Sequence, residues 1–117
     1  MVSLFAFDEE ENLFSAKIDG VELVCEEVTP EFEKAAPALA RAYHEKLPQI
    51  VAFMLDDIAE VFGDMTADGL TEALGVPQID LDREVISYLE HTLDDCHIID
   101  VEYSGLFDEF YEVSIDG

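Results

Sequence analysis

The sequence predicts an α+β fold in which a small antiparallel β-sheet packs against a central group of helices. Three observations lead to this prediction. Apolar, β-prone segments lie near both ends of the chain, apolar residues recur at helical spacing between them, and 117 residues suffice for one domain. Half of the residues are hydrophobic and eight are Phe, which separates the chain from acidic disordered tails. We therefore expect residues 1–117 to form a single acidic domain.

The first 25 residues have the pattern of an antiparallel three-stranded meander. Residues 2–7 are apolar, and residues 12–18 alternate between polar and apolar side chains. Asp19 and Gly20 separate this second segment from the β-prone residues 21–25. An Asp-Gly pair between two such segments favours a type I′ hairpin, because this turn needs positive φ at both central residues.

The middle of the chain has the pattern of several helices. Thr29 is a good N-cap, and Pro30 suits the first helical position. We expect Pro37 to strain or restart this first helix, and Pro48 to open a second helix that ends at Gly63.

A short helix and a longer one are predicted next. Residues 68–74 should form the short helix, closed by Gly75, and residues 83–93 the longer one, capped by Asp80 or Asp82. Residues 97–103 and 109–115 are expected to close the fold as a pair of strands around Ser104 and Gly105. The sheet would then consist of the N-terminal meander and this C-terminal pair.

The charge balance excludes several classes of partner. The chain has 29 acidic and 5 basic side chains, a formal net charge of −24. Direct binding of nucleic acid or of an anionic membrane needs positive charge that the chain lacks. The apolar segments are far shorter than the roughly 20 residues of a membrane span, and no basic flank marks a signal peptide. We expect a cytoplasmic protein that mutual repulsion keeps monomeric.

The charge is also unevenly distributed along the chain. Residues 1–46 have 11 acids and 4 bases, a net charge of −7, whereas residues 47–117 have 18 acids and one base, a net charge of −17. A net charge of magnitude about 2 to 8 is enough to keep a small domain soluble. The excess in the second segment therefore points to a function for the carboxylates themselves.

No motif indicates an enzyme. The three histidines lie outside every zinc-protease, C-x-x-C and nucleophile-elbow pattern. His91, Cys96 and His97 form at most a loose ligand set, without the pair spacing and fourth ligand of zinc sites. The second cysteine, Cys25, is expected to be reduced and buried, as is Cys96. We expect no catalytic residue, no cofactor and no metal.

Residues 64–69 imitate the first half of an EF-hand calcium loop. Asp64, Thr66 and Asp68 stand at ligand positions, but the twelfth position, where the bidentate Glu belongs, is Gly75. The segment is better interpreted as a turn between two helices, and any calcium binding would be weak.

Carboxylates recur at regular spacings after residue 47. Between Asp56 and Glu72 they follow one another at four-residue steps, which places successive Cβ atoms about 5 to 6 Å apart where the chain is helical. Asp100 and Glu102 lie on one face of a predicted strand, about 6.6 Å apart. Such rows resemble the spacing of phosphates along a nucleic acid. The residues predicted to mimic phosphates are Asp56, Asp57, Glu60, Asp64, Asp68, Glu72, Glu90, Asp94, Asp95, Asp100 and Glu102.

The hypothesis of phosphate mimicry requires a high density of negative charge on the surface. A folded chain of 13.1 kDa exposes roughly 6,400 Å², or about 270 Å² for each net charge if charge is spread evenly. Duplex DNA has very roughly one charge per 110 Å². Mimicry therefore requires the acids to gather on one side, which we expect to be formed by the helices after residue 47 and the final strands.

The whole chain resembles a known class of protein. It opens Met-Val-Ser-Leu-Phe-Ala-Phe-Asp-Glu-Glu-Glu-Asn and closes Tyr-Ser-Gly-Leu-Phe-Asp-Glu-Phe-Tyr-Glu-Val-Ser-Ile-Asp-Gly. In these residues, in length and in acidity it is similar to small bacterial DNA-mimic proteins that bind the histone-like nucleoid protein HU. The resemblance implies no catalysis. It implies binding to the DNA-binding site of a basic protein and association with the nucleoid through that partner.

Three functions follow from these observations as hypotheses. The first is a DNA mimic that competes with DNA for a basic protein such as HU and so modulates DNA packaging or regulation. The second is an immunity protein or inhibitor of a basic toxin or nuclease, which would use the same anionic surface. The third is a weak calcium-binding domain. General acidic adaptation to high salt would also explain the composition, although eight Phe residues fit it poorly.

Overall fold

The computed structural model describes residues 4–116 and contains nine regular elements. In chain order they are β1 (Ala6–Asp8), β2 (Leu13–Ile18), β3 (Val21–Cys25), α1 (Pro30–Phe62), α2 (Ala67–Leu74), β4 (Gln78–Asp80), β5 (Val85–Tyr88), β6 (Ile98–Ser104) and β7 (Glu109–Asp116). None of the described helices is both long and apolar enough to cross a membrane.

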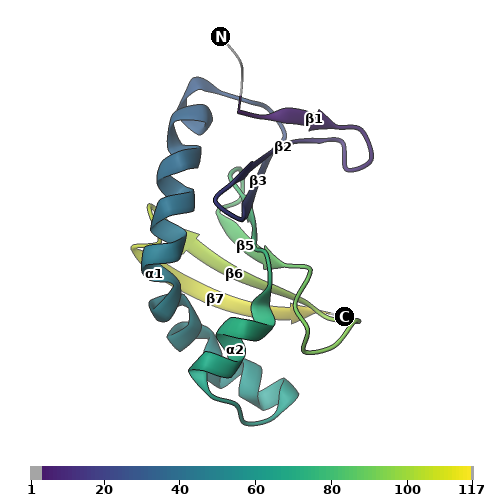
Figure 1. The fold of residues 1–117 in the computed structure, drawn as a ribbon, viewed down its shortest axis with the longest axis vertical. Helices are drawn as coiled ribbons and strands as arrows, with labels where there is room; N and C mark the ends of the chain where they lie inside the picture. The colour runs from purple at the N-terminus through teal and green to yellow at the C-terminus, as the bar shows by residue number, and fades with distance from the viewer. Residues whose placement is uncertain (1–3, 117) are drawn as a thin grey trace.

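The strands of residues 4–116 belong to a single seven-stranded sheet in the order β1 to β7. Neighbouring strands are antiparallel except β3 and β4, which are parallel. Parallel neighbours need a long crossover, and α1 and α2 supply it. The fold is α+β, but the predicted small antiparallel sheet is wrong: the two predicted strand groups are joined by β4 and β5 into one larger, mixed sheet. Two helices, rather than a central group, pack beside it (Figure 1).

The helix predicted over residues 83–93 is wrong, because residues 85–88 form strand β5. Ile86, Ser87 and Tyr88 are consecutive buried residues, as expected for an interior strand and not for one face of a helix. Asp80 accepts hydrogen bonds from the backbone of residues 82 and 83, but it closes a tight turn and caps no helix. Glu84, at φ 54°, then turns the chain into β5.

The two helices expected between residues 30 and 62 are one continuous helix, α1, which contains both Pro37 and Pro48. Both prolines lie on its exposed side, where water can reach the backbone groups that a proline leaves unpaired. The predicted ends are confirmed. The Thr29 side chain accepts a hydrogen bond from the Phe32 backbone N–H, and Gly63 is the C-cap.

The N-terminal meander is confirmed: β1 pairs with β2 and β2 with β3, both antiparallel. Asp19 and Gly20 form the predicted turn, with φ 51° and 78°. Of the predicted first strand, residues 2 and 3 lie outside the described part of the chain. The C-terminal pair is also confirmed, as β6 and β7, with a register shift after Glu102.

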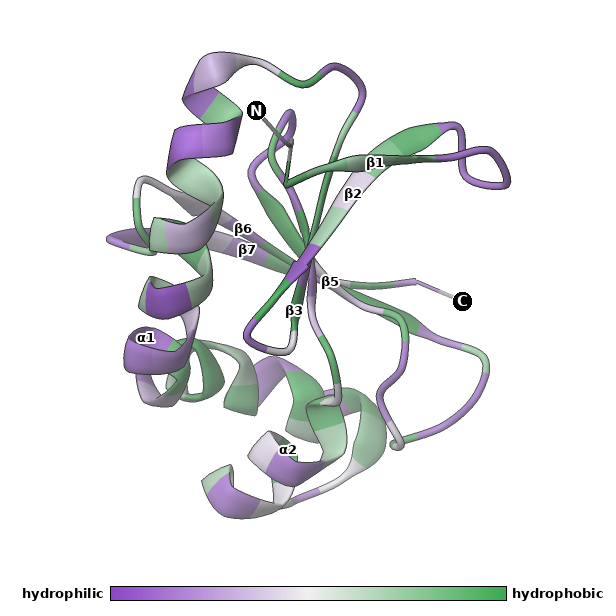
Figure 2. Cartoon of the chain, turned by 45° about the horizontal axis from the view of Figure 1, so that its top comes forward, coloured by the Kyte–Doolittle hydropathy of each residue, from purple (hydrophilic) through white to green (hydrophobic). Residues whose placement is uncertain are grey.

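The core lies between α1 and one face of the sheet. From α1 it takes Ile50, Met54 and Ile58, which are fully buried together with Ile99 and Val101 of β6. The strands fan out through a strong twist, and α2 lies beside the C-terminal half of α1 (Figure 2). Because both helices lie on one face, the opposite face of the sheet carries the polar side chains of the strands.

Candidate acidic binding surface

The sheet face turned away from the core, called the open face below, is mainly polar and acidic. Alternation along β6 separates buried Ile99, Val101 and Tyr103 from Asp100 and Glu102. The register extends this separation to the other strands. The residues of the open face are Ala6, Asp8, Leu13, Ser15, Lys17, Glu22, Val24, Gln78, Asp80, Val85, Ser87, Ile98, Asp100, Glu102, Ser104, Glu109, Glu112, Ser114 and Asp116.

Hydrogen bonds between neighbouring strands fix two carboxylates of the open face. The Gln78 amide donates to Glu22 Oε1 at 2.8 Å, and the Ser87 hydroxyl donates to Asp100 Oδ1 at 2.5 Å. Both contacts use only part of each carboxylate, and neither neutralises its charge. The sheet therefore holds these anions in place and leaves them able to bind a cation.

Glu102 and Glu112 lie directly opposite each other on β6 and β7. A hydrogen bond between the two side chains, partial desolvation and the charge of Glu112 together raise the pKa of Glu102 above its ordinary value. Like charges at directly opposed positions destabilise a sheet. This pair is thus a point of concentrated negative charge that proton uptake or a basic partner would relieve.

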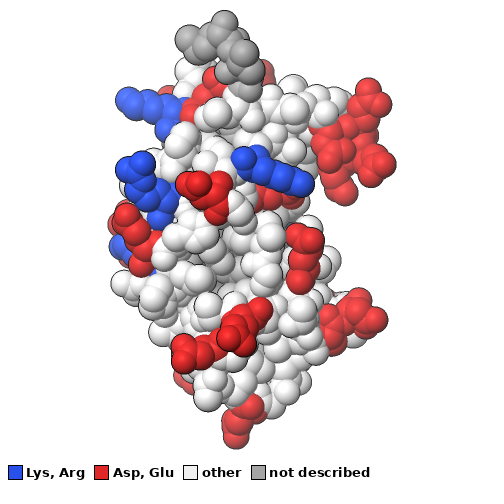
Figure 3. Space-filling view, in the orientation of Figure 1, with Lys and Arg blue, Asp and Glu red and all other residues white. Residues whose placement is uncertain are grey.

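A second group of acids, the helix-end group, surrounds the end of α1 and the whole of α2. Its members are exposed and are Asp56, Asp57, Glu60, Asp64, Asp68 and Glu72. Neither α2 nor the last turn of α1 contains a Lys or Arg. Figure 3 shows the result on one face of the molecule: blue side chains lie in its upper and middle parts, while the region around α2 shows only red and white.

The remaining predicted acids lie in the loop between β5 and β6. Glu90 and Asp95 are exposed, whereas Asp94 is half-buried and tied to its neighbours. Desolvation would raise the pKa of Asp94, but hydrogen bonds from His97 and Cys96 outweigh it and lower this pKa to about 2. The predicted residues thus occupy three places: the open face, the helix ends and this loop.

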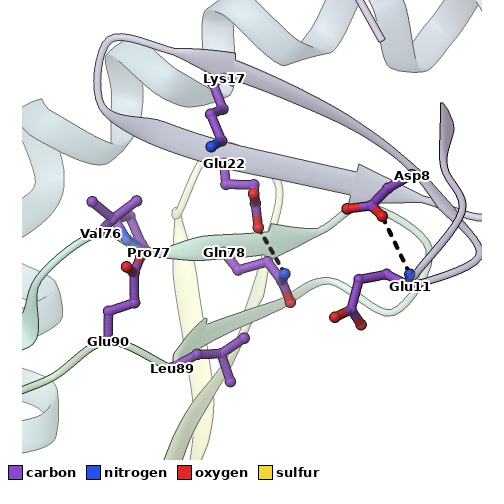
Figure 4. Close-up of a pocket in the computed structure, with 9 residues that line it drawn as sticks. All are labelled: Asp8, Glu11, Lys17, Glu22, Val76, Pro77, Gln78, Leu89 and Glu90. Atoms are coloured by element: carbon purple, nitrogen blue, oxygen red, sulfur yellow. Dashed lines mark hydrogen bonds between the residues drawn. The ribbon is translucent and has the colours of Figure 1, made fainter. Parts of the chain in front are cut away.

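One edge of the open face is hollowed into an acidic pocket of about 300 Å³. Four carboxylates and one ammonium group line it, from Asp8, Glu11, Glu22, Glu90 and Lys17, a formal charge of −3. Figure 4 shows Asp8 and Glu11 on one side, and Glu90 beside the apolar Val76, Pro77 and Leu89 on the other. A long side chain with a cationic head fits such a lining, because the apolar residues can contact its stem.

Sequence reasoning missed most of these pocket residues. Only Glu90 is among the predicted acids, because the charge asymmetry of the sequence points to the segment after residue 47. The run of four acids at residues 8–11 was a visible signal, but its approach to residue 90 depends on the parallel pairing of β3 with β4. Glu112 was missed because its pairing with Glu102 depends on the register of β6 and β7.

Few of the acids are neutralised within the molecule. Among the described residues, Asp108 contacts Lys46 at 3.9 Å and Asp80 contacts Arg83 at 3.1 Å, and these are the ion pairs formed with Lys or Arg. The net charge of −24 over an accessible area of 7085 Å² is about one charge per 300 Å², below the density of DNA. A match to the charge density of DNA therefore depends on how the carboxylates cluster locally and not on the net charge of the whole protein.

Thr66, one of the three residues of the calcium hypothesis, has a structural role at the start of α2. The Thr66 hydroxyl caps α2 by accepting the Gly69 N–H at 3.0 Å, so it is engaged at the helix start. Among the described residues, side chains close enough to share a metal ion are those of Asp94, Cys96 and His97. Cys25 is buried as predicted, but Cys96 is exposed, and both thiols are free.

Comparison with protein-family models, with curated proteins and with solved structures finds no match to this chain.

Proposed function

We propose that this protein is a DNA mimic, whose carboxylates occupy the DNA-binding site of a basic protein, with the histone-like protein HU as the first candidate partner. The observation that carries the proposal is the set of carboxylates without a cationic partner on the open face and at the helix ends. Such a surface attracts a protein whose Lys and Arg side chains are arranged for phosphates. The protein would displace DNA and need no catalytic group.

The regular spacing of side chains on the sheet supports this proposal. Adjacent strands lie about 4.8 Å apart, and alternate residues along a strand about 6.6 Å apart. Asp100, Glu102 and Glu112 occupy neighbouring points of this grid, and the pairing of β6 with β7 holds them there. A rigid array loses less conformational entropy on binding than mobile acidic side chains would.

Competition for DNA tests the proposal. HU bound to a short labelled duplex is titrated with this protein at low salt and again at high salt, and free DNA is measured by gel shift. We expect release of DNA at low salt and a steep loss of competition as salt rises. If HU keeps its DNA in a large excess of the protein at low salt, HU is not the partner.

Variants with equal change in charge locate the surface. The test variant combines Asp56→Asn, Asp57→Asn and Glu60→Gln. The control combines Glu26→Gln, Glu27→Gln and Glu45→Gln, which are also exposed but lie outside the helix-end group and the open face. At about 0.5 kcal/mol for each exposed pair, the test variant should compete about tenfold less well. Equal losses in both variants would show that only bulk charge matters.

The pocket favours a second candidate function, inhibition of a basic toxin or nuclease. Its mixed acidic and apolar lining would hold one Lys or Arg side chain of a cognate enzyme more specifically than a flat surface could. Glu22→Gln with Glu90→Gln should then abolish inhibition of that enzyme, while competition for HU falls only by the roughly fivefold expected from losing two carboxylates at about 0.5 kcal/mol each. Loss of both activities together would instead make the pocket part of the DNA-mimic surface.

A further inference from the structure

We propose that the side chains of Asp94, Cys96 and His97 bind a divalent metal ion of borderline softness, with Zn²⁺ as the fitting ion. The three residues supply one oxygen, one sulfur and one nitrogen, and these ligand atoms all lie within 4.8 Å of one another. Thiolate, imidazole and carboxylate are the three protein ligands that zinc uses. The site is independent of the proposed competition with DNA.

The distances within this group are close to those of a tetrahedral zinc site. With zinc–ligand bonds of about 2.0 to 2.3 Å, tetrahedral geometry places a sulfur about 3.6 Å from a neighbouring nitrogen or oxygen ligand. Cys96 Sγ lies 3.3 Å from His97 Nδ1 and 3.6 Å from Asp94 Oδ2. Two of the three distances between the ligand atoms are therefore already close to those of a zinc site.

The third edge is shorter, because Asp94 Oδ2 and His97 Nδ1 lie 2.5 Å apart in a direct hydrogen bond. A metal would replace the proton between them and move the two atoms to about 3.4 Å. Both side chains are partly exposed, with relative accessibilities of 26% and 31%, so a small rotation of each can open this edge. A water molecule would complete the four-coordinate geometry.

The backbone of the loop is held in the conformation that brings these ligands together. Asp94 Oδ1 accepts the backbone N–H groups of Cys96 and His97, which leaves Oδ2 directed at the sulfur and the imidazole. Metal binding thus requires no rearrangement of the backbone, only the small side-chain rotations described above and the loss of the thiol proton and of the proton on the imidazole nitrogen.

The buried side chain of His91 is hydrogen-bonded to the backbone of the same loop and is not one of the proposed ligands. Its Nδ1 accepts the Leu93 N–H at 3.2 Å, so Nε2 carries the proton and donates to the His97 carbonyl at 2.7 Å. Phe62, at the end of α1, packs edge-on against both imidazoles, with ring centroids 6.1 and 5.6 Å away. These contacts fix the position of His97 relative to the helix.

Cobalt titration of the reduced, tag-free protein tests the site, because Co²⁺ reports a thiolate ligand by a near-ultraviolet charge-transfer band. We expect one equivalent to bind with this band and with visible d–d bands, and Zn²⁺ to abolish both. Cys96→Ser should remove the charge-transfer band. His97→Ala and Asp94→Asn should each weaken Zn²⁺ binding at least tenfold, measured by calorimetry.

Two controls separate this site from the general acidity of the surface. Asp95→Asn removes a neighbouring exposed carboxylate outside the ligand set, and Cys25→Ala removes the other thiol. Both variants should keep the band and bind Zn²⁺ within about threefold of the parent protein. A band that survives Cys96→Ser, absence of the band in the parent protein, or equal weakening by Asp94→Asn and Asp95→Asn would each overturn the proposal.

Discussion

The opposed glutamates of β6 and β7 show how a single pairing sets local electrostatics. Glu102 has its pKa raised, through its hydrogen bond with Glu112, desolvation and the neighbouring charge. A raised pKa means that the folded protein binds this proton more tightly than the unfolded chain does. The resulting stabilisation is complete below the ordinary value of 4.5 and is lost as the pH rises through the raised pKa.

Replacing one member of this pair should therefore stabilise the protein at neutral pH. We expect Glu112→Gln to raise the melting temperature at pH 7, to leave it nearly unchanged at acidic pH, and to return the pKa of Glu102 toward 4.5. Thermal denaturation across pH and carboxyl NMR titration measure both effects. Asp116→Asn is the matched control, because Asp116 lies opposite Ile98 and has no carboxylate across from it. Equal increases in melting temperature for Glu112→Gln and Asp116→Asn would contradict a specific repulsion between Glu102 and Glu112.

Individual residues of the candidate surface could be predicted only where local periodicity decides their position. Strand alternation was enough to place Asp100 and Glu102 on one face, as the structure has them. Sequence could not reveal Glu112 as the partner of Glu102, because the register shift between the strands sets that pairing. Nor could it reveal that Asp94, rather than His91, lies beside Cys96 and His97, because the fold of the loop decides which side chains converge, and His91 is buried with both ring nitrogens hydrogen-bonded to the backbone.

At the scale of the elements, Gly75 shows how tightly the end of α2 is joined to the β5–β6 loop. Its φ of 71° is in the left-handed region, and a Cβ placed there would lie 2.8 Å from the carbonyl oxygen of Glu90. Gly20 has a similar φ of 78° in the β2–β3 turn, but a Cβ there would meet nothing within 4 Å. An alanine at Gly20 would therefore cost only backbone strain, whereas an alanine at Gly75 would cost backbone strain and steric overlap.

We expect Gly75→Ala to lower the free energy of unfolding by about 3 kcal/mol or more, and Gly20→Ala by only about 1 to 2 kcal/mol. The difference arises because only the first change forces the backbone near Glu90 to move. Urea denaturation of both variants measures it. Similar losses would mean that the loop moves aside without cost, and that the pocket beside Glu90 is not rigid.

Some ends of elements follow from local signals, although Pro48 and Asp80 do not begin the helices predicted for them. Thr29, Gly63 and the Asp19-Gly20 turn were identified correctly, because capping and turn geometry act over a few residues. The apolar spacing of residues 83–93 fits the period of a helix, whereas pairing with β4 and β6 makes residues 85–88 an interior strand. The same pairing, together with β4, turned an expected small antiparallel sheet into a mixed one.

At the scale of the whole molecule, the acids create a repulsion that the fold must overcome. Asp80 and Asp108 are the carboxylates paired with Lys or Arg in the described part of the chain, so little of the charge of −24 is compensated internally. Salt screens such repulsion, because the Debye length falls from about 10 Å at 0.1 M to about 3 Å at 1 M. The same screening weakens attraction to a basic partner.

Salt should therefore change folding and binding in opposite directions. At pH 7 we expect the melting temperature to rise by several degrees between low and 1 M sodium chloride, while competition with DNA for a basic protein disappears over the same range. Near the pI of about 4.1 the net charge is close to zero, so the stabilisation by salt should largely vanish. Differential scanning calorimetry at both pH values measures this. A melting temperature that does not respond to salt at pH 7 would show that the carboxylates are too far apart to repel one another, and would remove the crowding of negative charge on which the proposed mimicry depends.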